Sequence, residues 1–449
     1  MSSIRNIDIE SPVDEKILIE NNDGTIVFTE IVGNTTAEIE NEIIFYGSDN
    51  NKSLVINNDG IKVKSICDLN NNPLVFNRNQ KNKIIYNYDF KNLDVFSLKS
   101  GWSLVNNKLQ NSLYGIDNRL LLNKSFILDP RLFICDFNVS ENTEIFFGTQ
   151  RDFNYYGDGN ILTSVDFSTK QIKYYGKYIS SNIPSTPSLT SNFTINNYTD
   201  RNFRFIIQHE NRGVSLYLYD LLTGEKLSEL MCVDGTQEAS FTCYDKYFVY
   251  SSATQVEIIK MLVTAKNYIG ECKAIIYGDS ITYGQATSIS EAYSYKLASY
   301  LGNSFVSGMS AGTISQVLDR LDTENKSQIP NYTICCIGTN GGNTPDRLKT
   351  FIEKCLEINS TPILCTTPQL GDTIGVSSTN AQIISVCEQY GLIPVRFDIA
   401  TSIGNNPNNG RNTDLFRDSV HPNAAGHLAM YNRIFIDYPE LINIINNQN

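Results

Sequence analysis

A serine, a histidine and an aspartate in this chain stand in settings that suit nucleophilic catalysis. Ser280 follows Gly278-Asp279 just after a short apolar run, Ala274 to Tyr277, so a tight turn would present its hydroxyl at the carboxyl end of a buried strand. Asp418 lies three residues before His421. A carboxylate so placed can accept from one imidazole nitrogen while the other faces a serine hydroxyl. These residues predict a nucleophile, a base and an orienting acid.

Two glycine-containing stretches between them offer hydrogen-bond donors for an oxyanion. The segment Ser307-Gly308-Met309-Ser310-Ala311-Gly312-Thr313 precedes a predicted helix, where free backbone N–H groups suit a negative charge. The segment Gly338-Thr339-Asn340 follows another apolar run, and the Asn340 amide can donate a further hydrogen bond. Both stretches are expected at the same edge of the domain as Ser280.

Each of these residues also has an ordinary structural explanation. Gly-Asp-Ser is a common turn sequence, Asp418 can charge a helix start, His421 can cap or pack, and Asn340 can shape its turn. All of them meeting at one sheet edge by chance is the weaker explanation. Cys335 or Cys336 is a poorer nucleophile, because side chains in a continuous apolar run are usually packed on both faces of a strand.

The chain has only three histidines, so a role for histidine is easy to test. His209 lies between a predicted strand and a turn, and we expect it in a solvated loop. His427 is the rival base to His421. It is surrounded by apolar residues of the predicted last helix, which favours a structural role on a helix face.

The segment that holds the candidate residues alternates strands and helices. Strands are predicted at 274–277, 304–306, 333–337, 362–366 and 394–397. Helices are predicted at 291–301, 313–325, from the Thr344 cap with Pro345 in the first turn, at 380–390 and from Asn423. This order predicts a flavodoxin-like α/β domain, in which helices cover both faces of a parallel sheet and ligands bind at the carboxyl ends of its strands.

The preceding part of the chain is predicted to be all β. From about Tyr86 to Val263, short runs alternate apolar and polar residues, which indicates an antiparallel β-sandwich. Its strand order resembles the concanavalin-like and laminin-G-like jelly rolls that often accompany carbohydrate-active enzymes. Its many tyrosines are explained more simply as strand residues than as a sugar-stacking surface. Asp23-Gly24 and Asp59-Gly60 predict hairpins in a β-rich arm, giving domains at 1–75, 76–265 and 266–449.

Composition narrows the function classes. The 449 residues carry 36 Lys+Arg and 48 Asp+Glu, a net charge of -12, which disfavours a nucleic-acid partner. No apolar run of membrane-spanning length is present, and Met1 to Lys16 lacks the apolar core of a signal peptide, so neither a membrane nor cleaved export is expected. Ten cysteines without C-x-x-C spacing indicate buried thiols made in a reducing cytoplasm, with no disulfide frame, metal or cofactor.

Four blocks of this sequence resemble the SGNH (GDSL-like) hydrolase family, in order: Gly278-Asp279-Ser280-Ile281-Thr282, the pair Gly308 and Gly312, Gly338-Thr339-Asn340, and Asp418-Ser419-Val420-His421-Pro422-Asn423. The resemblance covers about residues 270–440. It implies Ser280 as nucleophile, His421 as base and Asp418 as orienting acid. It also implies an oxyanion hole made by the Ser280 N–H, a second-block glycine N–H and the Asn340 side chain.

Two departures from the family pattern bear on that oxyanion hole. Gly341 stands where the third block usually has Asp, so other contacts must position Asn340. The spacing of the second block is one residue off, which leaves Ala311 or Gly312 as the donor. We choose Gly312 because glycine tolerates more backbone geometries.

The expected reaction is two-step hydrolysis of an ester, with a short acyl group such as acetate on a carbohydrate. The loop from Thr401 to Arg417, rich in Asn and Gly, is expected to wall the pocket. One alternative is a structural adhesin, because the N-terminal arm resembles attachment segments of bacteriophage tail or fibre proteins. Such a virion protein would form a trimer and bind glycan with little turnover. Another alternative is a cellular polysaccharide esterase with an appended binding module.

Overall fold

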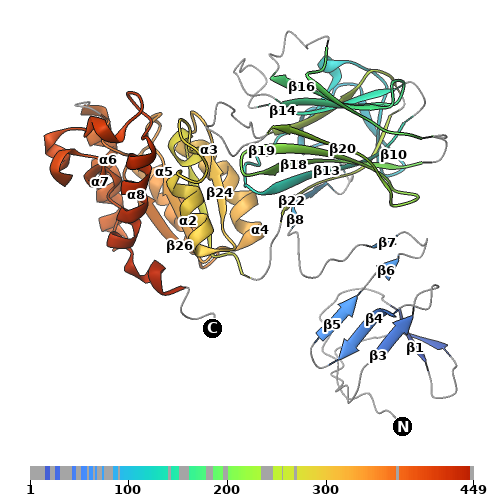
Figure 1. Cartoon of the computed structure of the whole chain (residues 1–449), viewed down its shortest axis with the longest axis horizontal. Coiled ribbons are helices and arrows are strands. Elements are labelled where there is room, and N and C mark those ends of the chain that lie inside the picture. The colour runs from blue at the N-terminus through green and yellow to red at the C-terminus, as the bar shows by residue number, and fades with distance from the viewer. Residues whose placement is uncertain are drawn as a thin grey trace. The chain divides into compact units, whose positions relative to one another are not determined.

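The computed structural model describes two compact units, residues 1–79 and 80–449 (Figure 1). In the first unit it describes only the strands. In the second unit it describes residues 84–88, 92–139, 143–150, 161–177, 186–195, 201–233, 246–254, 256–266, 271–370 and 374–444.

The strands of the first unit pair in an antiparallel manner. β1 (Lys16–Glu20) pairs with β2 (Ile26–Glu30), and β3 (Ile43–Tyr46), β4 (Lys52–Asn57) and β5 (Gly60–Val63) form a second sheet. Two short strands, β6 (Ile66–Cys67) and β7 (Pro73–Leu74), pair with each other. The strands that flank both predicted Asp-Gly turns are therefore paired, whereas residues 21–25 and 58–59 of those turns lie outside the described residues.

The first half of the second unit is an antiparallel β-sandwich of two sheets, as predicted. The first sheet contains β8 (Ile84–Tyr88), β10 (Trp102–Val105), β11 (Lys108–Asn111), β13 (Arg131–Asn138), β18 (Phe203–Glu210), β19 (Gly213–Asp220), β20 (Lys226–Val233) and β22 (Glu257–Ala265). The second contains β9 (Phe96–Leu98), β12 (Leu120–Leu122), β14 (Glu144–Gln150), β15 (Ile161–Asp166), β16 (Gln171–Lys177), β17 (Leu189–Asn192) and β21 (Lys246–Ser251).

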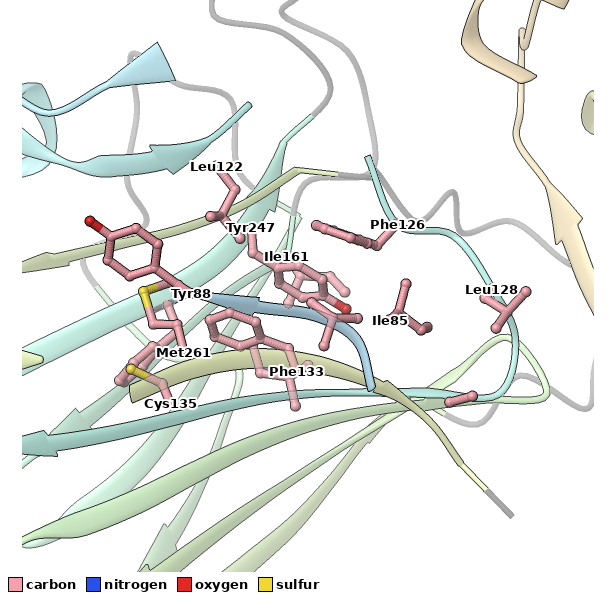
Figure 2. Packing of buried hydrophobic residues seen from close by; sticks show 14 of the residues in the cluster. Ile85, Tyr88, Leu122, Phe126, Leu128, Phe133, Cys135, Ile161, Tyr247 and Met261 are labelled. Carbon is pink, nitrogen blue, oxygen red and sulfur yellow. The ribbon is translucent and has the colours of Figure 1, made fainter. Parts of the chain in front are cut away.

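Aromatic rings fill the space between the two sheets. Phe133 of the first sheet stacks on Tyr247 of the second, with ring centroids 4.3 Å apart, and Figure 2 shows both rings among the aliphatic side chains of the core. Phe205 and Phe147 form a second cross-sheet pair at 4.6 Å. Burial of these large rings supplies much of the stability of a sandwich.

The structure corrects the prediction for His209. This residue lies inside β18, opposite Arg131 and Val214, and it is 2% exposed. Burial lowers the pKa of its imidazole well below the usual value, so the ring is neutral at neutral pH. The prediction of a solvated loop was wrong because β18 continues to Glu210 and turns within only two residues.

The second half of this unit is the predicted α/β domain, with four parallel strands in the order β24-β23-β25-β26. The strands are β23 (Ala274–Gly278), β24 (Phe305–Gly308), β25 (Tyr332–Cys336) and β26 (Thr361–Cys365). The helices are α1 (Ser280–Tyr283), α2 (Tyr293–Leu301), α3 (Ile314–Arg320), α4 (Lys326–Gln328), α5 (Pro345–Leu356), α6 (Ile374–Gln389), α7 (Phe397–Ala400) and α8 (Ala424–Asp437).

Helices cover both faces of this sheet, because successive strand residues point to opposite sides. Ile275 and Tyr277 belong to the core that contains side chains of α3, α5 and α6. Ala274 and Ile276 belong to the core that contains side chains of α2 and α8. The strand order matches a flavodoxin-like sheet, in which the strand order reverses beside the first strand.

Three predicted elements differ from the structure. The helix predicted at 380–390 is α6, which begins at Ile374. The fifth strand is reduced to one parallel bridge between Cys365 and Val395, because the chain enters α7 at Phe397 and leaves the sheet. The helix predicted at 313–325 is α3 followed by a π-helical turn, η2 (Leu321–Asn325). The predicted cap is present, since Thr344 accepts from the Arg347 N–H, and the last helix begins at the predicted place, where Asn423 accepts from the Gly426 N–H.

A buried carboxylate links the sandwich to the α/β domain. Glu324 in η2 is fully buried and accepts hydrogen bonds from the N–H groups of Ile127 and Leu128 at 2.6 and 2.9 Å. Its second oxygen accepts from the Ser307 hydroxyl at 2.7 Å and lies 4.0 Å from the buried guanidinium of Arg320. One side chain therefore satisfies donors from both halves of the unit.

Glu324→Ala should lower the free energy of unfolding by about 3–5 kcal/mol, because it leaves two buried N–H groups without their acceptor and the buried Arg320 guanidinium without its counter-charge. Glu324→Gln should lower the free energy of unfolding by less, because its carboxamide oxygen can still accept hydrogen bonds. Equilibrium urea unfolding followed by fluorescence measures both. Glu357→Ala, at an exposed position, is the control and should leave the urea midpoint nearly unchanged. A Glu324→Ala midpoint equal to that of Glu357→Ala would contradict this account of the junction.

Candidate active site

The candidate nucleophile lies at the start of a single helical turn. β23 ends at Gly278, Asp279 caps α1 by accepting from the Ile281 N–H at 3.0 Å, and Ser280 is the first residue of the helix. Gly284 ends the turn in the left-handed region, with φ of 77°, and donates to the carbonyls of Ile281 and Ser280. The sequence predicted a tight turn here, and the structure makes it helical. The Ser280 N–H, in the first turn of a helix, has no intrahelical acceptor.

Two glycines allow α1 to lie against the strand ends. A Cβ on Gly278 would lie 2.0 Å from the Thr282 hydroxyl oxygen and 2.4 Å from the Cys336 carbonyl. A Cβ on Gly308 would lie 2.4 Å from the Tyr283 backbone nitrogen. Any side chain at either position would therefore push α1, and Ser280 with it, away from the sheet edge.

His421 and Asp418 complete a chain of hydrogen bonds with Ser280. The His421 Nε2 lies 3.1 Å from the Ser280 Oγ, and its Nδ1 lies 2.8 Å from the Asp418 Oδ2. The other Asp418 oxygen accepts from the N–H groups of Val420 and His421 at 2.7 Å each. A carboxylate beside Nδ1 favours the tautomer with the proton on Nδ1, which leaves Nε2 as an acceptor for the serine hydroxyl.

The three side chains differ in exposure. Ser280 is 5% exposed, whereas the side chains of His421 and Asp418 are 16% and 48% exposed. Partial burial alone would raise the pKa of Asp418, but the hydrogen bonds from His421 and Val420 outweigh it and hold that pKa below 3.8. Asp418 is therefore ionised at neutral pH and can stabilise a positive charge on the imidazole.

The loop before Asp418 holds the acid and the base in place. The Arg411 guanidinium donates to the carbonyls of Asp418 and Ser419, and the Arg417 N–H donates to the His421 carbonyl at 3.0 Å. Phe416 forms an isolated bridge with Pro422. This loop contains the short turns η3 (Ile403–Asn405), η4 (Pro407–Asn409) and η5 (Thr413–Leu415). Its expected role as a pocket wall stays a prediction.

The predicted oxyanion donors lie on neighbouring loops. The Asn340 amide donates to the Gly312 carbonyl at 3.0 Å, which positions this exposed side chain without the Asp that Gly341 replaces. The Gly312 N–H donates to the Met309 carbonyl at 2.9 Å and so closes its own turn. Ala311 has a left-handed backbone, with φ of 52°. The assignment of Gly312 as a donor to the substrate stays a prediction, with Ala311 as its alternative.

The rival groups are buried. His427 lies on α8 and is fully buried, its ring stacks on Tyr293, and burial lowers its pKa to about 3. This matches the structural role predicted for it. Burial also raises the pKa of the Cys335 and Cys336 thiols well above the usual value, so these groups stay protonated and weakly nucleophilic.

Asp279 is the residue whose importance the sequence analysis missed. It is fully buried directly before Ser280, and burial raises the pKa of its carboxyl to about 6, although hydrogen bonding to Ile281 opposes the shift. The available signal was its residue type, since Asp is a preferred helix N-cap. A helix starting at Ser280 would have had to be predicted first.

The part of the chain that the structure describes holds no group of three or more His, Cys, Asp or Glu side chains suited to a metal ion. No described helix combines the length and hydropathy needed to cross a bilayer.

Comparison with known families finds one match. Residues 276–429 match the model of the GDSL-like Lipase/Acylhydrolase family, so the C-terminal part of the chain contains a GDSL-like domain. A search of the curated proteins found no match.

Solved structures similar to this chain include three esterases or lipases. A GDSL-like lipase from Bacteroides thetaiotaomicron has 17% identity and a TM-score of 0.33, covering 38% of this chain and 88% of its own. The acetyl xylan esterase AlAXEase has 20% identity and a TM-score of 0.31, covering 36% and 98%. The acetylxylan esterase Axe2 from Geobacillus stearothermophilus has 16% identity and a TM-score of 0.31, covering 37% and 94%.

Asp279→Asn should change how stability depends on pH. The pKa of the Asp279 carboxyl rises from 3.8 to about 6 on folding, so the folded protein binds the proton more tightly and loses stability as the pH rises from about 4 to 6. Asn keeps the cap to the Ile281 N–H but cannot ionise. The free energy of unfolding of the variant minus that of the parent should therefore increase by about 3 kcal/mol over this range and stay constant above it. Urea unfolding at a series of pH values measures it, and a pH-independent difference would contradict the buried carboxyl.

Proposed function

We propose that this GDSL-like domain is a working serine esterase, with Ser280 as nucleophile, His421 as general base and Asp418 as the acid that orients it. One observation carries the proposal. The imidazole of His421 lies within hydrogen-bond distance of both the Ser280 hydroxyl and the Asp418 carboxylate. That arrangement is the nucleophile, base and orienting acid of serine hydrolases, and geometry identifies it better than sequence position does.

In the first step, the Ser280 Oγ attacks the ester carbonyl carbon while the His421 Nε2 takes its proton. Asp418 stabilises the imidazolium that forms. The negative charge on the carbonyl oxygen is stabilised by the Ser280 N–H, the Asn340 amide and one N–H of the second block, that of Gly312 or, as its alternative, that of Ala311. Collapse of this intermediate breaks the bond to the alcohol, which leaves with the proton from His421, and the acyl group stays on Ser280.

In the second step, water attacks the acyl-enzyme. His421 takes a proton from the water, the same donors hold the oxyanion, and the carboxylic acid leaves as Ser280 regains its proton. General-base assistance contributes about 10²–10⁴-fold to the rate, and each oxyanion donor about 10²–10³-fold.

We infer further that the substrate is a short acyl ester, such as O-acetyl, on a carbohydrate. The loops beside Ser280 present polar groups, since the Ser310 hydroxyl donates to the Gln285 side chain and the Arg417 guanidinium donates to the Ala286 carbonyl. Asp418 and Asn340 are exposed. These polar loops suit a hydroxyl-rich substrate with a small acyl group better than a long acyl chain, which gains affinity from apolar walls.

Ser280→Ala and His421→Ala should each lower kcat on p-nitrophenyl acetate by about 10³-fold or more, because each removes a group that reacts in both steps. Asp418→Ala should lower kcat by a smaller factor, because water can reach the half-exposed position of the carboxylate and partly replace its hydrogen bond to His421. The control is Ser299→Ala, an exposed serine of α2, which should keep parental kcat. Near-UV circular dichroism checks that each variant is folded. Parental turnover by a folded Ser280→Ala variant would refute the assignment.

The parent should prefer p-nitrophenyl acetate to p-nitrophenyl octanoate by about 10-fold or more in kcat/KM, since the described loops beside Ser280 present polar groups. It should also release acetate from acetylated oligosaccharides, measured by an enzyme-coupled acetate assay with the Ser280→Ala variant as blank. Equal or faster hydrolysis of the octanoate would point to lipid esters. If the parent hydrolyses p-nitrophenyl acetate but releases no acetate from sugars, the carbohydrate substrate is rejected and the esterase assignment is kept.

A further inference from the structure

The turn between β18 and β19 of the sandwich is unusual. Asn211 and Arg212 form a two-residue turn in which both residues have positive φ, 50° and 58°. Hairpins of this kind favour Asn-Gly, and a left-handed conformation costs a residue with a Cβ about 1–2 kcal/mol. The residue at the second position of this turn is nevertheless an arginine, and it is buried, with 2% of its surface exposed. A buried arginine in a strained turn indicates that its side chain makes compensating contacts.

Those contacts are with the α/β domain. The Arg212 guanidinium donates to the carbonyls of Gly284 and Thr287 at 2.9 and 3.1 Å. Its central carbon lies 5.7 Å from the ring centroid of Tyr283 and 5.8 Å from that of Tyr295, within the range of cation–π attraction. The side chain thus bridges from the sandwich to the segment that follows α1.

The backbone of the same turn is also tied down. The two oxygens of Asp129 accept from the N–H groups of Asn211 and Arg212 at 2.8 Å each, and one of them accepts from the Tyr295 hydroxyl at 2.8 Å. Burial raises the pKa of this carboxyl, but three donors surround it. The turn is therefore held on the α/β domain through both its backbone and its side chain.

The segment 284–287, which Arg212 holds, contacts three of the chain segments that carry candidate site residues. Gly284 ends the helical turn that begins at Ser280, and the Gln285 N–H donates to the Ser280 carbonyl at 2.9 Å. The Gln285 side chain accepts from Ser310 in the oxyanion loop at 3.0 Å. Ala286, with φ of 68°, accepts from Arg417 in the loop of the base.

From these contacts we propose that Arg212 is a positioning residue for the esterase, and that the β-sandwich therefore forms part of the support of the active site. This inference rests on the proposed function. By holding the carbonyls of Gly284 and Thr287, Arg212 keeps the segment 284–287 in the conformation that fixes Ser280 relative to His421. Arg212 does not touch the substrate, so its loss changes the rate of the chemical step and leaves substrate binding alone.

Arg212→Gly separates this role from the stability of the hairpin. Asn-Gly is the preferred sequence for such a turn, so the variant keeps or improves the hairpin while it removes the guanidinium. We expect kcat on p-nitrophenyl acetate to fall about 10–100-fold, because displacement of a reacting group by about 1 Å has an effect of this size, with KM nearly unchanged. Labelling of Ser280 by a fluorophosphonate should slow by a similar factor. Guanidinium ion well below denaturing concentrations should restore part of the rate.

Arg204→Met is the matched control. It removes the arginine of β18, which pairs with Asp136 within the sandwich, and it should keep parental kcat. An equal loss of kcat in Arg204→Met and Arg212→Gly would indicate a general effect of changes in the sandwich and would overturn the proposal. A folded Arg212→Gly variant with parental kcat and KM would overturn it as well. If that variant does not fold, Arg212→Lys, which keeps the charge but has a single donor group, should show an intermediate kcat, and parental kcat would count against the proposal.

Hydrogen–deuterium exchange makes the test independent of the proposed function. Amides of residues 280–287 should exchange faster in Arg212→Gly than in the parent, and those of Arg204→Met should not change. If the parent hydrolyses no ester, the proposed function fails, while faster exchange would still support Arg212 as the support of this segment. Unchanged exchange would overturn that support even in an active enzyme.

Discussion

The hydrogen bond between the Ser280 Oγ and the His421 Nε2 joins residues that are 141 positions apart in the chain. It forms only if the turn after β23 and the loop before α8 are both held to within a few tenths of an ångström. Close packing at Gly278 and Gly308 sets the first of these, and the hydrogen bonds of Arg411 and Arg417 set the second. Much of the α/β domain can be understood as the means of keeping this one distance.

The junction with the sandwich adds a second layer of constraint. Its polar groups, Glu324, Arg320, Asp129 and Arg212, are buried or nearly so. Burying a charged group is costly unless its hydrogen bonds are satisfied, so such groups contribute less to stability than to the uniqueness of one arrangement. Each carboxylate here accepts from backbone N–H groups of the sandwich and from a hydroxyl of the α/β domain. A sliding or rotated junction would leave these groups without partners.

Errors in reading the sequence arose where local pattern and tertiary contact disagreed. His209 has the neighbours of a loop residue in sequence, but it is buried because β18 extends to a two-residue turn. The run at 394–397 has the composition of a strand, yet it makes one bridge because the chain turns into α7.

The sequence by itself determined the fold class, four of the five parallel strands and the helix cap at Thr344, and it predicted which residues lie at the sheet edge. These features depend on period, turn chemistry and residue type, which act over a few neighbouring positions. Only the tertiary structure decided that Asp279 is buried, that Asn340 is held by the Gly312 carbonyl, and that Arg212 of the sandwich supports the turn of Ser280. Such contacts join residues far apart in the chain, and they are selected by how whole elements pack rather than by any local pattern.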